Sequence, residues 1–187
     1  MKALSYAVRT LLITALLVLT GSTFGTLNAS AAKAPRIVSS PESWLNEQVH
    51  HKLAMLPWYG VFDNLQYRIN GSDVILEGQV VTDVTKADAE AAVKSIEGVT
   101  RVVNNIEVLP VSPFDDQIRR AEYQAIYSQP QLSRYAMGVV PQIHIIVNGG
   151  HVTLEGVVAT EADRDVAGLS ANRVPGVFSV TNNLRVG

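Results

Sequence analysis

Residues 148–160 read NGGHVTLEGVVAT and residues 70–82 read NGSDVILEGQVVT, so the same pattern occurs twice, 78 residues apart. In each copy an Asn-Gly turn is followed by aliphatic residues in alternate positions and then by a glycine. Laid without gaps, residues 64–109 and 142–187 share 15 identities in 46 positions. A period this long indicates a duplicated domain, since solenoid repeats run to roughly 20–50 residues. The matched residues are turn glycines and alternating aliphatics, which preserve a fold and not a catalytic constellation.

Each copy is predicted to fold as a hairpin, a helix and a third strand. Leu65, Tyr67 and Ile69 alternate with polar residues, which is the period of a half-buried strand. The Asn-Gly dipeptide that follows suits a tight turn between two strands. An alanine-rich helix comes next, and its apolar stripe consists of Ala89, Ala92, Val93 and Ile96 in the first copy and of Ala167, Ser170, Ala171 and Val174 in the second. The valines after Gly98 and Gly176 then predict a third strand that pairs with the hairpin.

A further helix is predicted before each hairpin. Its apolar stripe consists of Leu45, Val49, Leu53 and Leu56 in the first copy, and of Ile118, Ala121 and Ala125 in the second. Pro57 and Pro130 end these helices, because proline disrupts the interior of a helix. The expected fold is therefore α+β, with two tandem αββαβ domains, each a three-stranded mixed sheet covered on one face by two helices.

The N-terminus has the pattern of a secretory signal. Lys2 and Arg9 precede a short apolar run at residues 11–19, and Ala29-Ser30-Ala31 supplies the small residues of a cleavage site. The apolar run is much shorter than the ~20 residues of a membrane span. We expect residues 1–31 to be a signal peptide cleaved near Ala31 and residues 32–41 to be a flexible lead-in. The remaining chain is expected to be exported and soluble.

Composition excludes several classes of function. Without Lys2 and Arg9 the chain carries 13 basic and 17 acidic residues, a net charge of −4, whereas nucleic-acid binders have strongly basic surfaces. The sequence contains no cysteine, which excludes disulfides and thiolate metal sites. Adjacent His50 and His51 point about 100° apart on a helix, so they do not form a ligand pair. Because the sequence has no nucleophile elbow, phosphate loop or metal motif, we expect no cofactor, no metal and no catalysis.

The repeated pattern resembles the BON domain. Its marks are VTLEGVV at residues 152–158, then an alanine-rich helix, then VPGVFSVTNNL at residues 174–184. In the first copy Glu97 stands in place of Pro175, and Ile106 in place of Leu184. We expect BON-like domains at residues 42–109 and 115–187, joined by a short proline-rich linker at residues 110–114. The resemblance implies a periplasmic address and a non-catalytic role in binding phospholipid or other envelope components.

The candidate ligand site is the helix that opens the second domain. The proposed lipid or partner contacts, on the predicted outer face of this helix and just beyond Pro130, are Arg119, Arg120, Tyr123, Tyr127, Arg134 and Tyr135. Tyrosine and arginine together suit a phospholipid headgroup, because the rings lie at the apolar boundary while guanidinium groups bind phosphate. The same face could instead contact the first domain or be an ordinary solvated surface.

A second candidate surface lies in the first domain. Trp44 and Met55 lie roughly opposite the predicted apolar stripe, and Trp58 and Tyr59 follow the helix. A helix that is apolar on two sides is usually buried on two sides. Domains of about 70 residues are also marginally stable alone. We therefore expect the two domains to pack on each other and to cover this surface at least in part, with membrane contact as the alternative.

Two functions remain open from the sequence. The first is a non-catalytic cell-envelope protein that contacts phospholipid headgroups, with peripheral membrane contact, and supports envelope integrity or the stress response. The second is a protein–protein adaptor or self-associating module in the periplasm that binds no lipid. Binding to liposomes separates them, because only the first predicts it.

Overall fold

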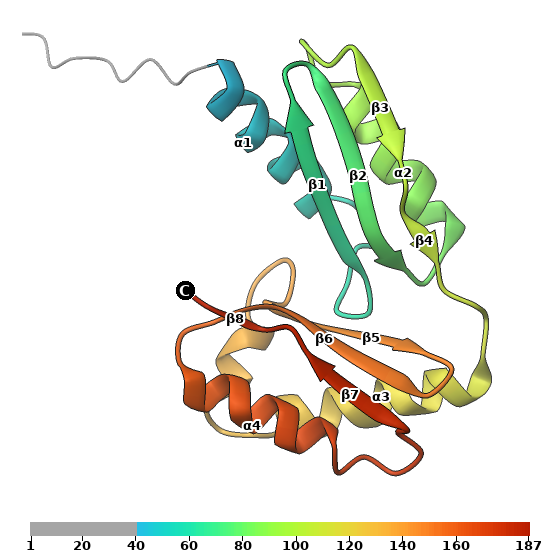
Figure 1. Cartoon of the computed structure of the whole chain (residues 1–187), viewed down its shortest axis with the longest axis vertical. Coiled ribbons are helices and arrows are strands. Elements are labelled where there is room, and N and C mark those ends of the chain that lie inside the picture. The colour runs from blue at the N-terminus through green and yellow to red at the C-terminus, as the bar shows by residue number, and fades with distance from the viewer. Residues whose placement is uncertain (1–40) are drawn as a thin grey trace, which may run out of the picture. The chain divides into compact units, whose positions relative to one another are not determined.

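The computed structural model describes residues 41–187 (Figure 1). The predicted signal peptide and residues 32–40 of the predicted lead-in lie outside the described residues. Domain 1 consists of α1 (Pro41–Ala54), β1 (Asn64–Asn70), β2 (Asp73–Val80), α2 (Asp83–Lys94), β3 (Arg101–Asn104) and β4 (Glu107–Val108). Domain 2 consists of α3 (Pro113–Tyr127), the 3-10 helix η1 (Ser133–Ala136), β5 (Ile143–Asn148), β6 (His151–Val158), α4 (Glu161–Ala171), β7 (Ser179–Asn182) and β8 (Arg185–Val186). The predicted tandem αββαβ architecture is confirmed.

Each domain has a mixed sheet in which the hairpin is antiparallel and the last strand is parallel. β1 pairs antiparallel with β2, and both β3 and β4 pair parallel with β2. β5 to β8 repeat this arrangement around β6. Parallel pairing needs a crossover connection, which α2 and α4 supply. The third strand of the prediction is thus divided into two short segments.

A repeated asparagine holds the break between these two segments. The side-chain amide of Asn104 donates to the carbonyl of Lys86 at 3.1 Å, and its oxygen accepts from the N–H of Ile106 at 3.2 Å. Asn182 makes the two equivalent bonds in domain 2. Each asparagine therefore links the last strand to the helix before it. This structural role explains why the asparagine occurs in both copies.

The repeated glycine in the return strand marks a close approach of two backbones. Gly78 and Gly156 have φ angles of +110° and +128°. A Cβ added at either position would lie 1.9 Å from a carbonyl oxygen, that of Asn64 or of Gln142. Only glycine fits there, because it has no Cβ and tolerates a positive φ.

The helices that follow the hairpins are capped by threonine and pack with the stripe that the sequence predicts. Thr82 caps α2 and Thr160 caps α4, each hydroxyl accepting a hydrogen bond from the N–H three residues later. Ala89 of α2 and Ala167 of α4 are fully buried. Small residues on the buried stripe let each helix approach its sheet closely.

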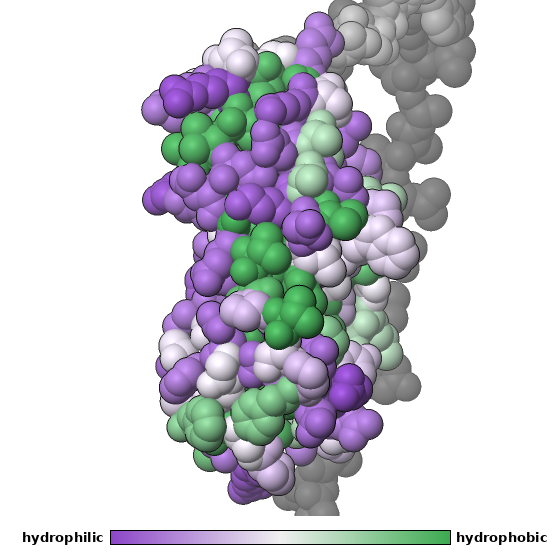
Figure 2. Space-filling view, turned by 90° about the vertical axis from the view of Figure 1, so that its right-hand side faces the viewer, coloured by the Kyte–Doolittle hydropathy of each residue, from purple (hydrophilic) through white to green (hydrophobic). Residues whose placement is uncertain are grey.

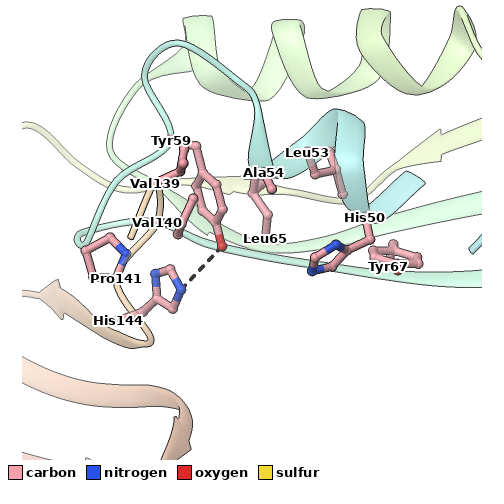
Figure 3. Close-up of a pocket in the computed structure, with 10 residues that line it drawn as sticks. All are labelled: His50, Leu53, Ala54, Tyr59, Leu65, Tyr67, Val139, Val140, Pro141 and His144. Atoms are coloured by element: carbon pink, nitrogen blue, oxygen red, sulfur yellow. Dashed lines mark hydrogen bonds between the residues drawn. The ribbon is translucent and has the colours of Figure 1, made fainter. Parts of the chain in front are cut away.

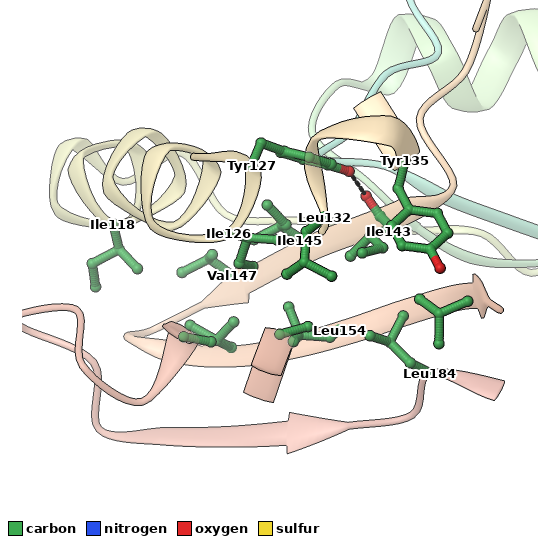
Figure 4. Close-up of a cluster of buried hydrophobic side chains, with 14 residues drawn as sticks. Ile118, Ile126, Tyr127, Leu132, Tyr135, Ile143, Ile145, Val147, Leu154 and Leu184 are labelled. Carbon is green, nitrogen blue, oxygen red and sulfur yellow. Dashed lines mark hydrogen bonds between the residues drawn. The ribbon is translucent and has the colours of Figure 1, made fainter. Parts of the chain in front are cut away.

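Each domain has its own hydrophobic core, and the two cores cover the first strand of the hairpin differently. Figure 4 shows side chains of α3 and β5 meeting those of β6 in domain 2. Ile143 and Ile145 of β5 are fully buried there, whereas the matching Leu65 and Tyr67 of β1 are only partly buried. Leu132, next to η1, adds to the domain 2 core, while residues 55–63 of domain 1 form turns and loop.

The loop before β1 contacts the edge of the second sheet. Residues 41–187 belong to one compact unit, and β5 is an edge strand of its sheet. The N–H of Ile145 donates to the carbonyl of Val61 at 2.8 Å. Val61 and Phe62 also pack against the domain 2 core. Loop residues thus satisfy part of an otherwise unpaired strand edge.

Candidate functional site

The helix predicted to bind lipid, α3, buries a different side from the one expected. Its buried residues are Asp115, Ile118, Arg119, Glu122, Ile126 and Tyr127. The helical wheel placed Ala121 and Ala125 in the core, but both are only half-buried. The prediction that Arg119 and Tyr127 lie on the exposed face of this helix is therefore wrong.

The orientation of α3 follows from two charged side chains that bind the neighbouring hairpin. Asp115 accepts hydrogen bonds from the N–H groups of Gly149 at 2.9 Å and Gly150 at 2.8 Å. Arg119, only 3% exposed, donates to the carbonyl of Val147 at 2.8 Å and to Asp116 at 2.6 Å. Arg119 therefore joins α3 to β5 and is not available to a headgroup.

Two of the predicted contact tyrosines are also structural. The hydroxyl of Tyr127 donates to the carbonyl of Ile143 at 2.5 Å (Figure 4), and burial raises the pKa of this hydroxyl. The hydroxyl of Tyr135 donates to Asp163 at 2.8 Å and accepts from the N–H of Ala159 at 2.8 Å. The prediction that Tyr135 is a surface contact is wrong for the same reason, because its ring is buried and its hydroxyl is occupied.

Arg134, Arg120 and Tyr123 remain accessible among the predicted contacts. Arg134 donates to Asp163 at 2.6 Å, and its guanidinium lies 4.9 Å from the ring centroid of Tyr135. Arg120 and Tyr123 are exposed on α3. Tyr123 also lines a shallow hollow, together with Gln124, Tyr127, Ser128, Ser133 and Ala136. The structure therefore keeps a reduced polar surface between α3 and η1.

Glu122 is a buried carboxyl group in α3 that the sequence did not single out. Its side chain is 0% exposed, and neither carboxylate oxygen has a hydrogen-bond partner among the described residues. Burial raises its pKa to about 8, because the charged form is poorly solvated there. Glu122 is therefore protonated near neutral pH and behaves as a neutral core residue.

The aromatic surface predicted in domain 1 is only partly an interdomain contact. Trp44, Met55 and Trp58 are 39%, 59% and 70% exposed, so these three side chains remain on the surface, and the expected partial cover by the second domain occurs at Tyr59. Tyr59 does make the contact, since its ring stacks on His144 with centroids 5.5 Å apart. The contact between the domains therefore involves Tyr59, the residue that follows Trp58, and not the two tryptophans or Met55.

Tyr59 and His144 lie in the pocket of Figure 3, which has a volume of about 370 Å³. The Tyr59 hydroxyl is 3.4 Å from Nε2 of His144. Burial raises the pKa of Tyr59 to about 12 and lowers the pKa of His144 below its usual value. Both side chains are therefore uncharged near neutral pH.

An exposed pair of phenylalanines forms one corner of domain 2. On the face in Figure 2, hydrophobic residues reach the surface in separate patches between hydrophilic ones. Phe114 at the start of α3 and Phe178 before β7 are 44% and 70% exposed, with ring centroids 6.2 Å apart. A Cβ at Gly150 would lie 2.7 Å from the Phe178 ring, and one at Gly176 3.3 Å from the Phe114 ring. The two rings therefore rest directly on glycine backbone.

The matching corner of domain 1 is polar. Phe178 corresponds to Thr100, and Gly150 corresponds to Ser72. The hydroxyls of Ser72 and Thr100 are 2.8 Å apart, and Thr100 donates to Asp73 at 2.9 Å. A comparison of identical residues in the two copies does not reveal this difference. The signal present in the sequence is a phenylalanine in one copy where the other copy has a threonine.

The described residues offer no evident metal or membrane-spanning element. Within residues 41–187 no three histidine, aspartate or glutamate side chains are grouped so as to hold a metal ion. In the same part of the chain no helix is both long enough and apolar enough to cross a bilayer. The candidate surfaces are the polar α3–η1 surface, the pocket at Tyr59 and His144, the aromatic corner, and the exposed Trp44, Met55 and Trp58 of domain 1.

The architecture is that of a tandem pair of small α+β domains, and comparison identifies its family. The chain matches the BON domain twice, over residues 41–110 and 115–187, and it belongs to the BON domain family. BON domains are generally non-catalytic binding domains, and the family is associated with phospholipid binding and envelope function. BON proteins are usually periplasmic or envelope-associated.

Other comparisons add little to this assignment. No curated protein shows significant sequence similarity to the chain. Similar solved structures include two of CdsD, a structural protein of the type III secretion system of Chlamydia trachomatis, one of them its C-terminal domain. Both are 12% identical; they cover 77% and 76% of this chain and 92% and 97% of theirs, with TM-scores of 0.29 and 0.28. Structural similarity with TM-scores this low supports no conclusion about the function of this chain.

Proposed function

We propose that this chain is a non-catalytic cell-envelope protein that attaches peripherally to phospholipid membranes through the corner formed by Phe114 and Phe178. The observation that carries the proposal is the exposure of two aromatic rings on a glycine platform, where domain 1 has a polar network. Because the fold accepts threonine at this position in domain 1, the exposed ring of Phe178 is not required for folding. The association of the family with phospholipid supports the same ligand class.

Insertion of the rings is the main source of affinity in this proposal. Complete burial of a phenylalanine side chain contributes about 1.5–3 kcal/mol. Phe178, at 70% exposure, can therefore add about 1–2 kcal/mol on entering the apolar boundary of a membrane. Electrostatic attraction is secondary, because Arg119 is buried and the chain after residue 31 carries a net charge of −4.

The polar surface between α3 and η1 is the proposed headgroup contact. Arg120 and Tyr123 are exposed on α3, and Arg134 is accessible although it is paired with Asp163. Guanidinium groups donate strong hydrogen bonds to phosphate. The contribution of Arg120 should weaken as salt screens it.

The proposed setting is the periplasm, where the protein would support envelope integrity or the stress response. The basic start, the short apolar run and the small residues at 29–31 support export with cleavage near Ala31. Mass spectrometry of periplasmic material tests this part of the proposal. A chain that keeps Met1 and sediments with the membrane would contradict it.

Co-sedimentation of residues 32–187 with vesicles of phosphatidylethanolamine and phosphatidylglycerol tests the membrane contact. Phe178→Thr, the residue of the other copy, should weaken binding about 5- to 30-fold, which corresponds to the loss of about 1–2 kcal/mol. Val84→Thr is the matched control, because it removes an exposed apolar side chain from α2 and should leave binding unchanged.

Two other results would point elsewhere. If Arg120→Glu abolishes binding while Phe178→Thr does not, the headgroup surface is the anchor and the corner is not. If the parent protein does not bind these vesicles, the proposal fails and the protein-adaptor function is favoured.

A further inference from the structure

Two hollows in the described structure share a wall. The pocket of Figure 3 and a second pocket of about 550 Å³ are both lined by Tyr59, Leu65, Tyr67 and His144. Because these four residues line both pockets, the pockets adjoin, and we treat them as the two halves of one cleft. We refer to the pocket of Figure 3 as the apolar half and to the second pocket as the polar half.

The two halves differ in chemistry. The apolar half is completed by His50, Leu53, Ala54, Val139, Val140 and Pro141. The polar half is completed by Asn64, Gln66, Glu155, Gly156, Asn183 and Arg185. Aliphatic side chains gather on one side of the shared wall, and amides, a carboxylate and a guanidinium gather on the other. This separation matches a molecule with an apolar chain and a polar head, and each half lies within the usual ~300–1,000 Å³ of ligand pockets.

The apolar half exists because β1 is covered less completely than β5. Leu65 and Tyr67 occupy the positions of Ile143 and Ile145, which are fully buried in domain 2. In domain 2 these positions fill the core, while in domain 1 they also line an open hollow. Since domain 2 buries the equivalent positions with the same fold, the open hollow is specific to domain 1.

The polar half contains a guanidinium group that is available for an anion. No ion pair formed within residues 41–187 includes Arg185, and its side chain is exposed. Glu155 accepts a hydrogen bond from the side-chain amide of Asn183 at 2.8 Å. Glu107 occupies the place of Arg185 in the first copy, so the fold does not demand a cation here.

The residues that line both halves add no charge of their own. Tyr59 and His144 stack at an interplanar angle of 14° and are both neutral near pH 7. Arg185 and Glu155 are therefore the charged groups of the polar half. A phosphate fits beside Arg185, because charge-assisted hydrogen bonds to guanidinium are strong. The amides of Asn64, Gln66 and Asn183 line the same half and offer hydrogen-bonding groups to the hydroxyls of the head.

We propose that this cleft binds one molecule of a monoacyl phospholipid, with the chain along the apolar half and the phosphate at Arg185. The inference rests on the proposed function only for the class of ligand. Membrane attachment takes place at the phenylalanine corner, whereas the cleft holds a single lipid molecule. The two events use different residues and can be separated by experiment.

Calorimetric titration of residues 32–187 with lauroyl lysophosphatidylglycerol below its critical micelle concentration tests the cleft. We expect one site per chain, no binding of glycerol 3-phosphate, and weaker binding of uncharged monolauroylglycerol. Arg185→Glu should weaken the binding of lysophosphatidylglycerol at least tenfold and leave the binding of monolauroylglycerol unchanged. Val139→Asp, at an exposed lining position, should weaken both ligands severalfold. Arg173→Glu, at an exposed arginine that does not line the cleft, is the matched control.

The outcomes distinguish the cleft from the corner. Arg185→Glu and Val139→Asp should keep vesicle binding, while Phe178→Thr should keep lysophospholipid binding. If the parent chain binds no lysophospholipid monomer, or if both cleft variants bind it as tightly as the parent, the cleft proposal is overturned and membrane attachment is unaffected. If Phe178→Thr alone removes lysophospholipid binding, the lipid occupies the corner and the cleft proposal is likewise overturned.

Discussion

Replacement of Glu122 by glutamine should remove a large part of the pH dependence of stability. Glu122 is fully buried in α3 without a hydrogen-bond partner among the described residues, and its pKa in the folded chain is about 8 against a usual 4.5. Below pH 4.5 the group is protonated in the folded and unfolded chains alike. Between pH 4.5 and about 8 only the unfolded chain ionises, so the free energy of unfolding falls as pH rises.

The size of the effect follows from the separation of the two pKa values. Each pH unit corresponds to about 1.4 kcal/mol, so the ionisation of Glu122 lowers stability by about 5 kcal/mol between pH 4.5 and 8. Glu122→Gln has no such ionisation. Its unpartnered amide costs about 1–3 kcal/mol, but this cost does not vary with pH. The stability of the variant relative to the parent should therefore rise by about 5 kcal/mol across this range.

Urea unfolding followed by far-ultraviolet circular dichroism at about pH 4.5 and about pH 8.5 measures the difference. Trp44 and Trp58, the two tryptophans of the chain, both lie in domain 1, so their fluorescence follows the unfolding of domain 1 while circular dichroism follows both domains. The change should appear in the transition of domain 2. A difference between parent and variant that is the same at both pH values would show that Glu122 ionises without cost, and would refute the reasoning.

Two further predictions concern the strand glycine and the buried histidine. Gly156→Ala should destabilise domain 2 by more than about 3 kcal/mol, because the new Cβ would lie 1.9 Å from a backbone carbonyl oxygen. Gly149→Ala, where the new Cβ would have no atom within 4 Å, should cost only about 1 kcal/mol. Equal decreases of the denaturation midpoint in the two variants would contradict this prediction. Burial lowers the pKa of His144 below its usual 6.5, so its contribution to stability is full above pH 6.5 and is lost as pH falls through the folded-state pKa. His144→Gln should lose less stability than the parent between pH 7 and pH 5, and an equal loss in both proteins would show that His144 is not responsible.

The sequence by itself determined the features that depend on neighbours along the chain. The hairpins follow from alternating aliphatics and Asn-Gly turns, and the caps at Thr82 and Thr160 follow from local hydrogen bonding. The buried stripes of α2 and α4 could be read correctly because small apolar residues occupy them at helical spacing. The duplication then extended each inference to both domains, since one pattern appears twice.

Only the tertiary structure decided which side of α3 is buried and which side chains remain on the surface. Arg119 and Asp115 are buried because backbone groups of the distant hairpin form hydrogen bonds with them. No pattern in the neighbouring sequence predicts such partners. Arg119 was therefore predicted as a surface contact. The same limit applies to the aromatic corner and the cleft. Phe114 meets Phe178, and Tyr59 meets His144, only when segments far apart in the chain come together.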